Sequence, residues 1–427
     1  MLKAVDLIVE GAGQLLTLAG NGPRAGKAMG LLGLMSDGAV AVADGLVVAV
    51  GTRSEVNEAY RAPRRIDVGG RVVLPGLIDP HTHVVFGGSR HEEFEQRIAG
   101  ATYLEIMAAG GGIMRTVRAT RACSEEDLVE AARPRLARML AHGTTTAEAK
   151  TGYGLTTADE LKCLRVTDEL NASQPVDLVP TFLGAHAVPE EYAGRAEAYV
   201  DLVIDEMLPA VTDWAKSTLS VDARSLPFCD VYCDEGAFSL EQSRRILEAA
   251  KKAGMGLKVH ADEFAHLGAA QLAADLGAVS ADHLLQTSPQ EIRAMAEAGT
   301  VAVLLPGTPF GLGLHDYADA RSMIDAQLPV ALGSDLNPGT CYCESMPFVM
   351  SLACRFMQMT PAEAIVAATV NAAHAVGRGK DLGCLQPGFA ADLLILEVED
   401  YRHLAYRFGT NLVSMVVKRG EVVVEQH

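Results

Sequence analysis

The stretch Leu74-Pro-Gly-Leu-Ile-Asp-Pro-His-Thr-His83 joins an apolar run to two histidines at alternate positions. In an extended chain, residues i and i+2 point to the same side, so the imidazoles of His81 and His83 are expected to face one point in space. Neutral imidazoles are common ligands of zinc and similar divalent cations. An H-x-H tripeptide also occurs by chance in loops, so this prediction depends on the rest of the chain.

Eight apolar segments with the character of buried strands alternate with amphipathic segments across the middle of the chain. The predicted strands are Leu74–Asp79, Thr144–Ala149, Val176–Leu183, Asp230–Cys233, Gly256–His260, Ala278–His283, Val301–Leu305 and Val330–Ser334. Eight such strands alternating with helices over roughly 300 residues favour an α/β fold, a (β/α)8 barrel of the TIM type, over a doubly wound sheet.

Four of the intervening helices are predicted to begin at capping boxes, in which the first and fourth side chains each bind a free backbone N–H group. The motifs are Thr157-x-x-Glu160, Ser239-x-x-Gln242, Ser288-Pro-x-Glu291 and Thr360-Pro-x-Glu363. The last two also carry proline at the first helical position, where its missing N–H group costs nothing.

Both ends of the chain predict short strands with turns. The N-terminal strands are Asp6–Glu10, Gly38–Ala43 and Leu46–Val50, and the C-terminal strands are Asp392–Glu397, Val413–Lys418 and Glu421–Glu425. Neither end is long enough to close a core alone, so we expect residues 1–72 and 386–427 to form one small composite β-sandwich domain. Residues 73–385 would then form the barrel.

Composition and charge restrict the partners. A formal net charge of −18 argues against nucleic acid or an acidic membrane surface as a partner. No apolar run is long enough to cross a bilayer, and charges in the first apolar stretch exclude a signal peptide. Eight scattered cysteines, without paired zinc-finger spacing, are typical of reduced thiols and predict a cytoplasmic location.

Polar side chains follow the ends of five predicted strands, and parallel barrel strands end at one rim. These side chains are His81 and His83, His186, His260 with Glu263, His283, and Asp335. Three imidazoles (His81, His83 and His260) and the Asp335 carboxylate would leave room for a water molecule, which is typical of a catalytic metal site. Isolated histidines such as His142, His266 and His403 are interpreted as structural.

The motif Pro75–His83, with His260, His283 and Gly333-Ser-Asp335, resembles the amidohydrolase superfamily. Within it, the chain is similar to the members that open an imidazolone ring. That closer resemblance rests on Ala99-Gly-Ala-Thr-Tyr103 with Gly110-Gly-Gly112, Lys150-Thr-Gly-Tyr-Gly154, Gly184-Ala-His186, His260-Ala-Asp-Glu263 and Ser334-Asp-Leu-Asn-Pro-Gly339. These motifs span the whole predicted barrel.

The resemblance implies one divalent metal ion, zinc or iron, held by His81, His83, His260 and Asp335. Binuclear relatives use a carboxylated lysine on the fourth strand, and Asp230–Cys233 contains none. The implied reaction is hydrolysis of the lactam C–N bond of 4-imidazolone-5-propanoate to N-formimidoyl-L-glutamate, by a homodimer. The implied substrate contacts are Arg90, Tyr153, His186, Glu263, Asn337, Gly339 and Thr340.

The implied roles agree with the chemistry of each group. Asp335 would take a proton from water, His283 would polarise the carbonyl group, and Glu263 would carry a proton to the leaving nitrogen. The Arg90 guanidinium suits the propanoate, unless it forms a surface ion pair with Glu92 or Glu93. Backbone N–H groups of the Asn337-Pro-Gly339 turn are further candidates for binding a carboxylate.

Two alternatives use the same sequence features. A metal-dependent deaminase of a nucleobase or related heterocycle would use the same ligands, with Arg90 left without a carboxylate to bind. A non-catalytic scaffold that retains the barrel would typically have lost metal ligands, and here the set is complete.

Overall fold

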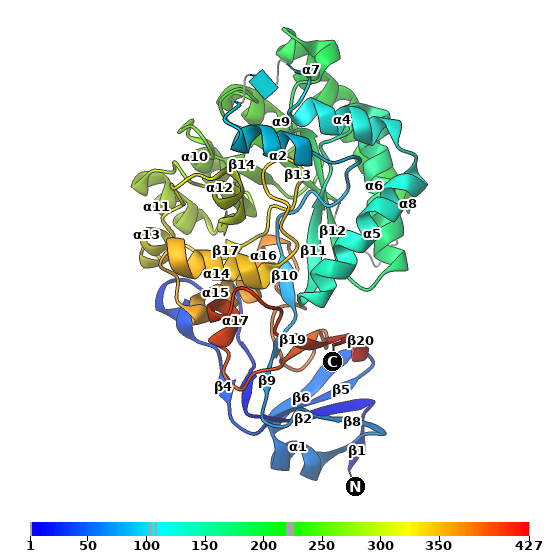
Figure 1. Ribbon diagram of the computed structural model, residues 1–427, viewed down its shortest axis with the longest axis vertical. Coiled ribbons are helices and arrows are strands. Elements are labelled where there is room, and N and C mark those ends of the chain that lie inside the picture. The colour runs from blue at the N-terminus through cyan, green and yellow to red at the C-terminus, as the bar shows by residue number, and fades with distance from the viewer. Residues whose placement is uncertain (1, 102–104, 107–108, 219–225, 427) are drawn as a thin grey trace.

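The structure is a computed structural model that describes residues 2–101, 105–106, 109–218 and 226–426. Thr102 and Tyr103 of the Ala99–Tyr103 motif lie outside these residues. Figure 1 shows a large unit of strands surrounded by helices, above a smaller unit of strands in which both chain ends lie. Among the described residues, no helix has the length and apolar character needed to span a membrane.

Eight parallel strands form the large unit, each paired with its neighbour in the sequence. They are β10 (Leu77–Asp79), β11 (Thr144–Lys150), β12 (Asp177–Ala185), β13 (Phe228–Cys233), β14 (Lys258–Ala261), β15 (Ser280–His283), β16 (Val301–Leu304) and β17 (Val330–Leu332). A parallel bridge between Thr82 and Leu336 joins the segments that follow the first and last strands. The predicted (β/α)8 barrel is confirmed.

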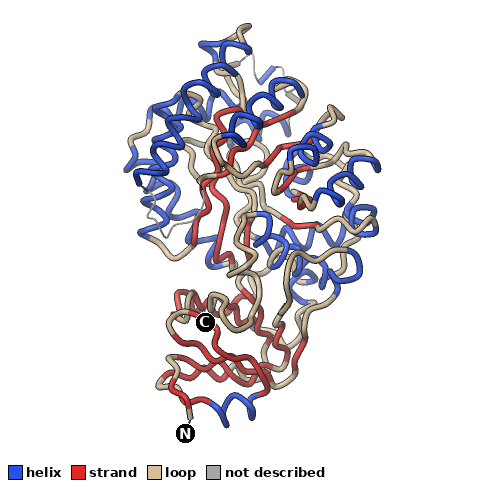
Figure 2. The backbone as a smooth tube through the Cα atoms, turned by 180° about the vertical axis from the view of Figure 1, so that it is seen from behind, coloured by secondary structure: helices blue, strands red, loops and turns tan. Residues whose placement is uncertain are grey.

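Helices surround the strands of this barrel (Figure 2). They are α2 (His91–Ile98), α4 (Ile113–Ala122), α5 (Glu125–Ala141), α6 (Thr157–Ser173), α7 (Ala196–Leu202), α8 (Leu208–Thr218), α9 (Leu240–Lys252), α10 (Ala269–Leu276), α11 (Pro289–Ala298), α12 (Gly307–Leu312), α13 (Ala320–Asp325), α14 (Met346–Phe356), α15 (Pro361–Ala367), α16 (Val370–Ala375) and α17 (His403–Tyr406). Each long helix buries one apolar face, as Ile246 and Leu247 of α9 illustrate. This burial excludes water from between the helices and the strands.

Three of the four predicted capping boxes are confirmed, at Ser239, Ser288 and Thr360. The fourth prediction is wrong, because α6 is capped by the preceding residue, Thr156, whose side chain accepts a hydrogen bond from the Asp159 N–H group. The Glu160 carboxylate instead accepts hydrogen bonds from backbone N–H groups in the loop at residues 152–155. Glu160 therefore shapes the loop before the helix.

The small unit contains two packed sheets, of which the larger combines strands from both chain ends and the smaller comes from the N-terminal end alone. The larger sheet has the order β20-β19-β18-β9-β3-β4 and the smaller one the order β6-β5-β2-β8. Their strands are β2 (Leu7–Ala12), β3 (Gln14–Leu16), β4 (Leu34–Met35), β5 (Gly38–Ala43), β6 (Leu46–Thr52), β8 (Arg64–Asp67), β9 (Val72–Pro75), β18 (Leu393–Leu396), β19 (Val413–Lys418) and β20 (Glu421–Glu425). Apolar side chains of both sheets, such as Val40 and Ile395, share one core.

The strand predicted as Leu74–Asp79 is divided in the structure. Its first part belongs to β9, which pairs with β18 and β3 of the small unit, and its second part is β10 of the barrel. Gly76 lies at the division, where a Cβ atom would be 2.2 Å from the Thr145 hydroxyl oxygen on β11. Only glycine lets the chain pass so close to the barrel as it leaves the sandwich.

Candidate metal centre and active site

Three histidines and an aspartate meet at the carboxyl ends of the barrel strands. His81 Nε2 lies 3.5 Å from Asp335 Oδ1, and His83 Nε2 lies 3.7 Å from the same oxygen. The ring centroids of His81 and His260 are 4.5 Å apart. One nitrogen from each of the three histidines lies within 4.8 Å of the other two. The structure therefore brings the four predicted ligands together.

These donors fit a divalent cation. His81 Nε2 and His260 Nε2 are buried and have no hydrogen-bond partner among the described residues. A buried polar atom without a partner is costly, unless it coordinates an ion. Burial lowers the pKa of His81 and of His83 well below the ordinary value, so both rings are neutral and carry a free lone pair. Neutral imidazoles and a carboxylate are ligands of zinc and iron.

Two aspartates contact the rings of His81 and His260 on the side away from Asp335 and orient them. His81 Nδ1 lies 2.7 Å from Asp282 Oδ2, and His260 Nδ1 lies 2.9 Å from Asp230 Oδ2. A carboxylate beside Nδ1 favours the tautomer with a proton on that nitrogen and leaves Nε2 to bind the ion. Neither Asp230 nor Asp282 was predicted from the sequence as a site residue. The available signal was their position, since Asp230 lies two residues after the start of β13 and Asp282 lies directly before His283 in β15.

Asp335 is held by its neighbours in a conformation that is unusual for a non-glycine residue. Its φ angle is 53°, in the left-handed region, and its N–H group donates to the His81 carbonyl oxygen at 3.0 Å. The Thr308 hydroxyl donates to Asp335 Oδ2 at 2.5 Å. Burial raises the pKa of Asp335 to about 6. Such backbone strain is common where a side chain must be aimed at a functional site.

Glu263 and His283 lie side by side next to the ligands. His283 Nδ1 lies 3.5 Å from Glu263 Oε1, and both side chains are buried. Burial raises the pKa of Glu263 well above its ordinary value, and the charge of Asp335 raises it further. Asp234, which was not predicted from the sequence as a site residue, accepts hydrogen bonds from the backbone N–H groups of residues 263–265. The loop is therefore fixed, and Glu263 is suited to hold and release a proton.

Tyr153 and His186 form one wall of the site. The His186 ring stacks on His83, with centroids 4.9 Å apart, and the Tyr153 ring lies 5.7 Å from His83. His186 Nδ1 lies 3.0 Å from the Gly152 carbonyl oxygen. The Glu160 carboxylate binds the backbone on both sides of Tyr153 and so fixes this wall.

Arg90 forms an ion pair with Glu93, but the pair is largely buried rather than on the surface. Arg90 Nε and Nη2 lie 2.9 and 2.8 Å from Glu93 Oε2. A Cβ atom on Gly339 would lie 2.2 Å from Arg90 Nη1, so the third nitrogen faces the loop after β17. Glu92 instead pairs with Arg115.

In the loop of residues 337–341, backbone N–H groups bond to other atoms of the loop. The N–H groups of Gly339 and Thr340 both donate to Asn337 Oδ1, at 2.8 Å each. The Asn337 N–H group donates to the Cys341 carbonyl oxygen at 2.8 Å. Both N–H groups of the Asn337-Pro-Gly339 turn are therefore engaged within the loop, so the prediction that they bind a carboxylate is wrong. The Asn337 side chain also donates to the Asp335 carbonyl oxygen, which ties the loop to Asp335.

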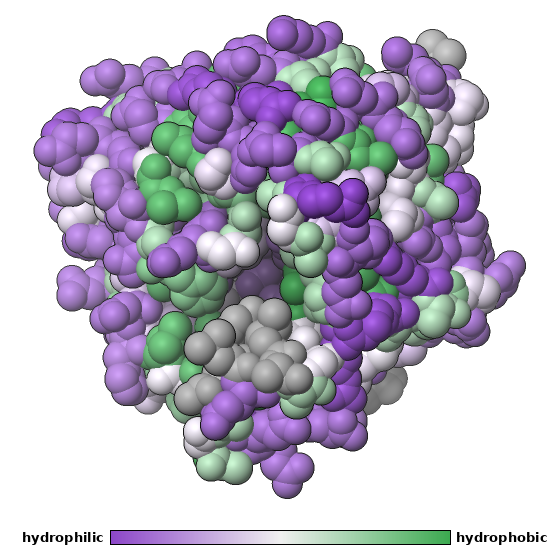
Figure 3. Space-filling model, turned by 90° about the horizontal axis from the view of Figure 1, so that it is seen from above, coloured by the Kyte–Doolittle hydropathy of each residue, from purple (hydrophilic) through white to green (hydrophobic). Residues whose placement is uncertain are grey.

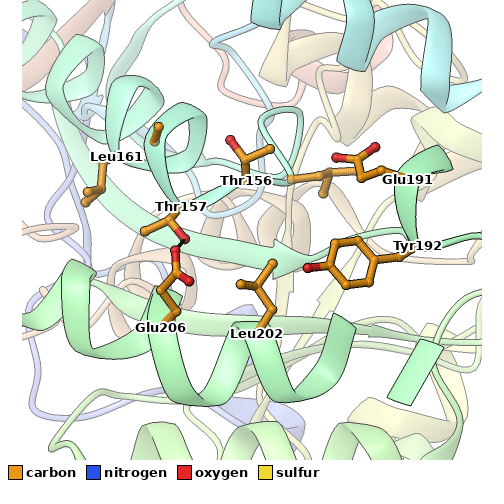
Figure 4. Close-up of a pocket in the computed structure, with 9 residues that line it drawn as sticks. Thr156, Thr157, Leu161, Glu191, Tyr192, Leu202 and Glu206 are labelled. Carbon is orange, nitrogen blue, oxygen red and sulfur yellow. Dashed lines mark hydrogen bonds between the residues drawn. The ribbon is translucent and has the colours of Figure 1, made fainter. Parts of the chain in front are cut away.

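The face that carries these strand ends is hollowed at its centre, with hydrophilic residues at depth (Figure 3). A separate surface pocket of about 540 Å³ lies beside the start of α6. Figure 4 shows the Thr157 hydroxyl pointing to the Glu206 carboxylate there, with Tyr192 and Leu202 nearby. None of the predicted site residues lines that pocket.

Comparison with known proteins identifies the family to which the chain belongs. The sequence profile of the amidohydrolase family matches residues 72–423, so the chain belongs to the amidohydrolase family. An atrazine chlorohydrolase from Arthrobacter aurescens TC1, solved in complex with zinc, has a similar fold. Its TM-score is 0.74 at 19% identity, and the match covers 98% of this chain and 95% of that one.

The more specific relatives are imidazolonepropionases. The protein of that name from Chloroflexus aggregans is 53% identical over 99% of both chains. The one from Herpetosiphon aurantiacus is 50% identical, with 98% of this chain and 97% of that protein covered. Within the amidohydrolases, the chain therefore belongs with the imidazolonepropionases.

Proposed function

We propose that this protein hydrolyses the lactam C–N bond of 4-imidazolone-5-propanoate and releases N-formimidoyl-L-glutamate, with one zinc or iron ion. The observation that carries the proposal is the convergence of His81, His83, His260 and Asp335 on one buried point. The full-length similarity to imidazolonepropionases supports the choice of substrate. We also propose that the enzyme works in the cytoplasm as a homodimer.

A single ion is supported by the side chains below the ligands. A second group of possible ligand atoms comprises His81, Glu148 and Asp282. The Lys150 ammonium lies 2.9 Å from Glu148 Oε2 and 3.3 Å from Asp282 Oδ2. A positive charge is therefore already in place at those carboxylates, and it disfavours a second cation there.

His81, His83, His260 and Asp335 would hold the ion. When bound, a divalent ion supplies Lewis acidity, which lowers the pKa of water and polarises a carbonyl oxygen. Asp335 Oδ2 accepts the proton of the attacking water, since its Oδ1 is the oxygen nearest His81 and His83. His283, a neutral ring beside the ligands, donates a hydrogen bond to the carbonyl oxygen as negative charge develops there.

Glu263 completes the proton transfer. It holds a proton because burial raises its pKa, and it delivers that proton to the ring nitrogen as the C–N bond breaks. The former carbonyl carbon then carries the new carboxylate. Tyr153 and His186 pack against the imidazolone ring, and Arg90 Nη1 binds the propanoate near Asn337, Gly339 and Thr340.

The decisive experiment measures activity and metal content on one sample. We expect about one zinc or iron ion per chain, hydrolysis of imidazolone propanoate, loss of activity after chelation and recovery when either ion is restored. Rapid ammonia release from a nucleobase, with imidazolone propanoate left intact, would instead identify a deaminase. Absence of bound metal, with no hydrolysis after reconstitution, would identify a non-catalytic scaffold.

A further inference from the structure

A fully buried network of charged side chains lies behind the metal-binding histidines, inside the barrel. It comprises Glu148 and Lys150 of β11, Asp230 of β13, Lys258 of β14 and Asp282 of β15. The side chains of all five have no exposed surface. Two of the five are cationic and three are anionic, so the network nearly balances its own charge.

Lys150 is the member that touches both ring-orienting aspartates. Its Nζ atom lies 2.7 Å from Asp230 Oδ2 and 3.3 Å from Asp282 Oδ2. The same two oxygen atoms lie beside His260 Nδ1 and His81 Nδ1. One ammonium group therefore contacts the two carboxylate oxygens that orient two separate metal ligands.

Stability alone does not account for this arrangement. Burying ions is expensive, and apolar side chains of similar size often stabilise a protein equally well or better. Burial opposes the charge on Lys150, but Asp230, Glu148 and Asp282 together raise its pKa above the ordinary value. The lysine is therefore a permanent cation, held where it orders both aspartates.

We propose that Lys150 is a positioning residue that fixes Asp230 and Asp282 together, so that His81 and His260 present their Nε2 atoms to the ion as a pair. The inference rests on the metal site of the proposed function. Without the ammonium, two buried carboxylates would repel each other. At least one of them would turn away from its present place, and the common support of both rings would be lost.

Lys258 provides a matched control. It is equally buried, but its ammonium contacts Glu148 at 2.8 Å and the Pro80 carbonyl oxygen at 3.0 Å. Neither contact is to an aspartate that orients a ring. Lys150→Met and Lys258→Met therefore remove the same charge from the same core, and only the first removes the bridge between Asp230 and Asp282.

The test measures binding of Co²⁺ to each variant by competition with a chelator, together with the absorption spectrum of bound Co²⁺. Imidazole N–H resonances of the zinc-loaded protein, labelled with ¹⁵N-histidine, report the two rings directly. We expect Lys150→Met to weaken Co²⁺ binding about 10- to 100-fold and to remove both Nδ1–H resonances. Asp282→Asn should affect the His81 resonance alone, and Lys258→Met should change neither resonance.

A folded Lys150→Met variant with unchanged Co²⁺ affinity and both resonances would overturn the proposal. Equal weakening by Lys150→Met and Lys258→Met would also overturn it, because buried charge rather than the bridge would then matter. If Lys150→Met does not fold, the proposal is tested by measuring Co²⁺ affinity in Asp230→Asn, in Asp282→Asn and in the double variant. Non-additive losses of Co²⁺ affinity in the double variant support coupling through Lys150, and additive losses refute it. Failure to hydrolyse imidazolone propanoate, with Co²⁺ binding intact, would contradict only the proposed reaction.

Discussion

The imidazole of His186 stacks on the imidazole of His83, with ring centroids 4.9 Å apart and planes inclined by 12°. His186 thus joins His83 to the loop that carries Tyr153, since its Nδ1 atom faces the Gly152 carbonyl oxygen. Burial lowers the pKa of His186 to about 3, so the ring is neutral. Because Nδ1 of this neutral ring donates to a carbonyl oxygen, its Nε2 atom is left as a hydrogen-bond acceptor.

The first prediction concerns this ring. His186→Phe keeps an aromatic surface against His83 but removes the ring nitrogens. We expect unchanged metal content and about a two- to tenfold rise in KM, since one lost hydrogen bond costs roughly 0.5–1.5 kcal/mol. The measurement is steady-state kinetics with metal analysis. His142→Phe, at the end of α5, is the matched control and should leave KM unchanged. Loss of metal from His186→Phe would show that the stack supports the ligand instead.

The second prediction separates proton transfer from metal binding. Glu263→Gln should lower kcat by about 10²- to 10⁴-fold, because an amide cannot deliver a proton to the leaving nitrogen. Metal content should stay at the wild-type level, since Glu263 is not among the ligands. Glu235→Gln is the control, because Glu235 is an exposed carboxylate that follows β13, and this variant should retain full activity. Near-normal kcat in Glu263→Gln would assign the proton transfer to another group.

The third prediction tests the carboxylate partner. Arg90→Met should raise KM for imidazolone propanoate about 10- to 100-fold, because a hydrogen bond to a charged group contributes roughly 1.5–3 kcal/mol. The amide analogue of the propanoate is the control substrate, and its kcat/KM should change little. Glu93→Gln should also raise KM, since Glu93 holds two of the Arg90 nitrogens. Equal losses for acid and amide would mean that Arg90 supports the loop and does not bind the carboxylate.

The fourth prediction concerns stability and pH. Asp177, at the start of β12, lies 3.1 Å from Lys418 Nζ and 2.9 Å from Arg419 Nη2, so it links the barrel to the β19–β20 hairpin. Burial opposes its charge, but the two cations lower its pKa below the ordinary value. The folded pKa is therefore lower than the unfolded one. The resulting stabilisation is present above the unfolded pKa and is lost as pH falls through the folded pKa.

Asp177→Asn should accordingly lower the free energy of unfolding by about 1–3 kcal/mol at neutral pH. The difference from wild type should shrink below roughly pH 4, near the ordinary pKa of aspartate. Denaturant unfolding of both proteins across a pH series measures this difference in the free energy of unfolding. Glu397→Gln, whose side chain pairs with Arg407 on the surface, is the control with a small expected effect. A difference that stays constant down to pH 2 would exclude the ionised pair as its source.

Much of the fold was predictable because its signals are local. Strand and helix periods, three capping boxes and the hairpins at both chain ends follow from residues close together in the sequence. The side chains of His81 and His83 lie on one face for a similarly local reason, since alternate residues of an extended chain point the same way. The convergence of His81, His83, His260 and Asp335 was then predictable from the rule that parallel barrel strands end at one rim.

The sequence by itself determined the alternation of strands and helices and the residue types at each strand end. Only the tertiary structure decided which distant buried charges meet: Lys150 with Asp230 and Asp282, and Lys258 with Glu148. It also decided that the chain divides at Gly76 between two sheets. The physical reason is the separation of the interacting residues in the sequence. Strand and helix periodicity depends on residues a few positions apart. The buried contacts depend on how the closed ring of barrel strands aligns segments that are far apart in the chain.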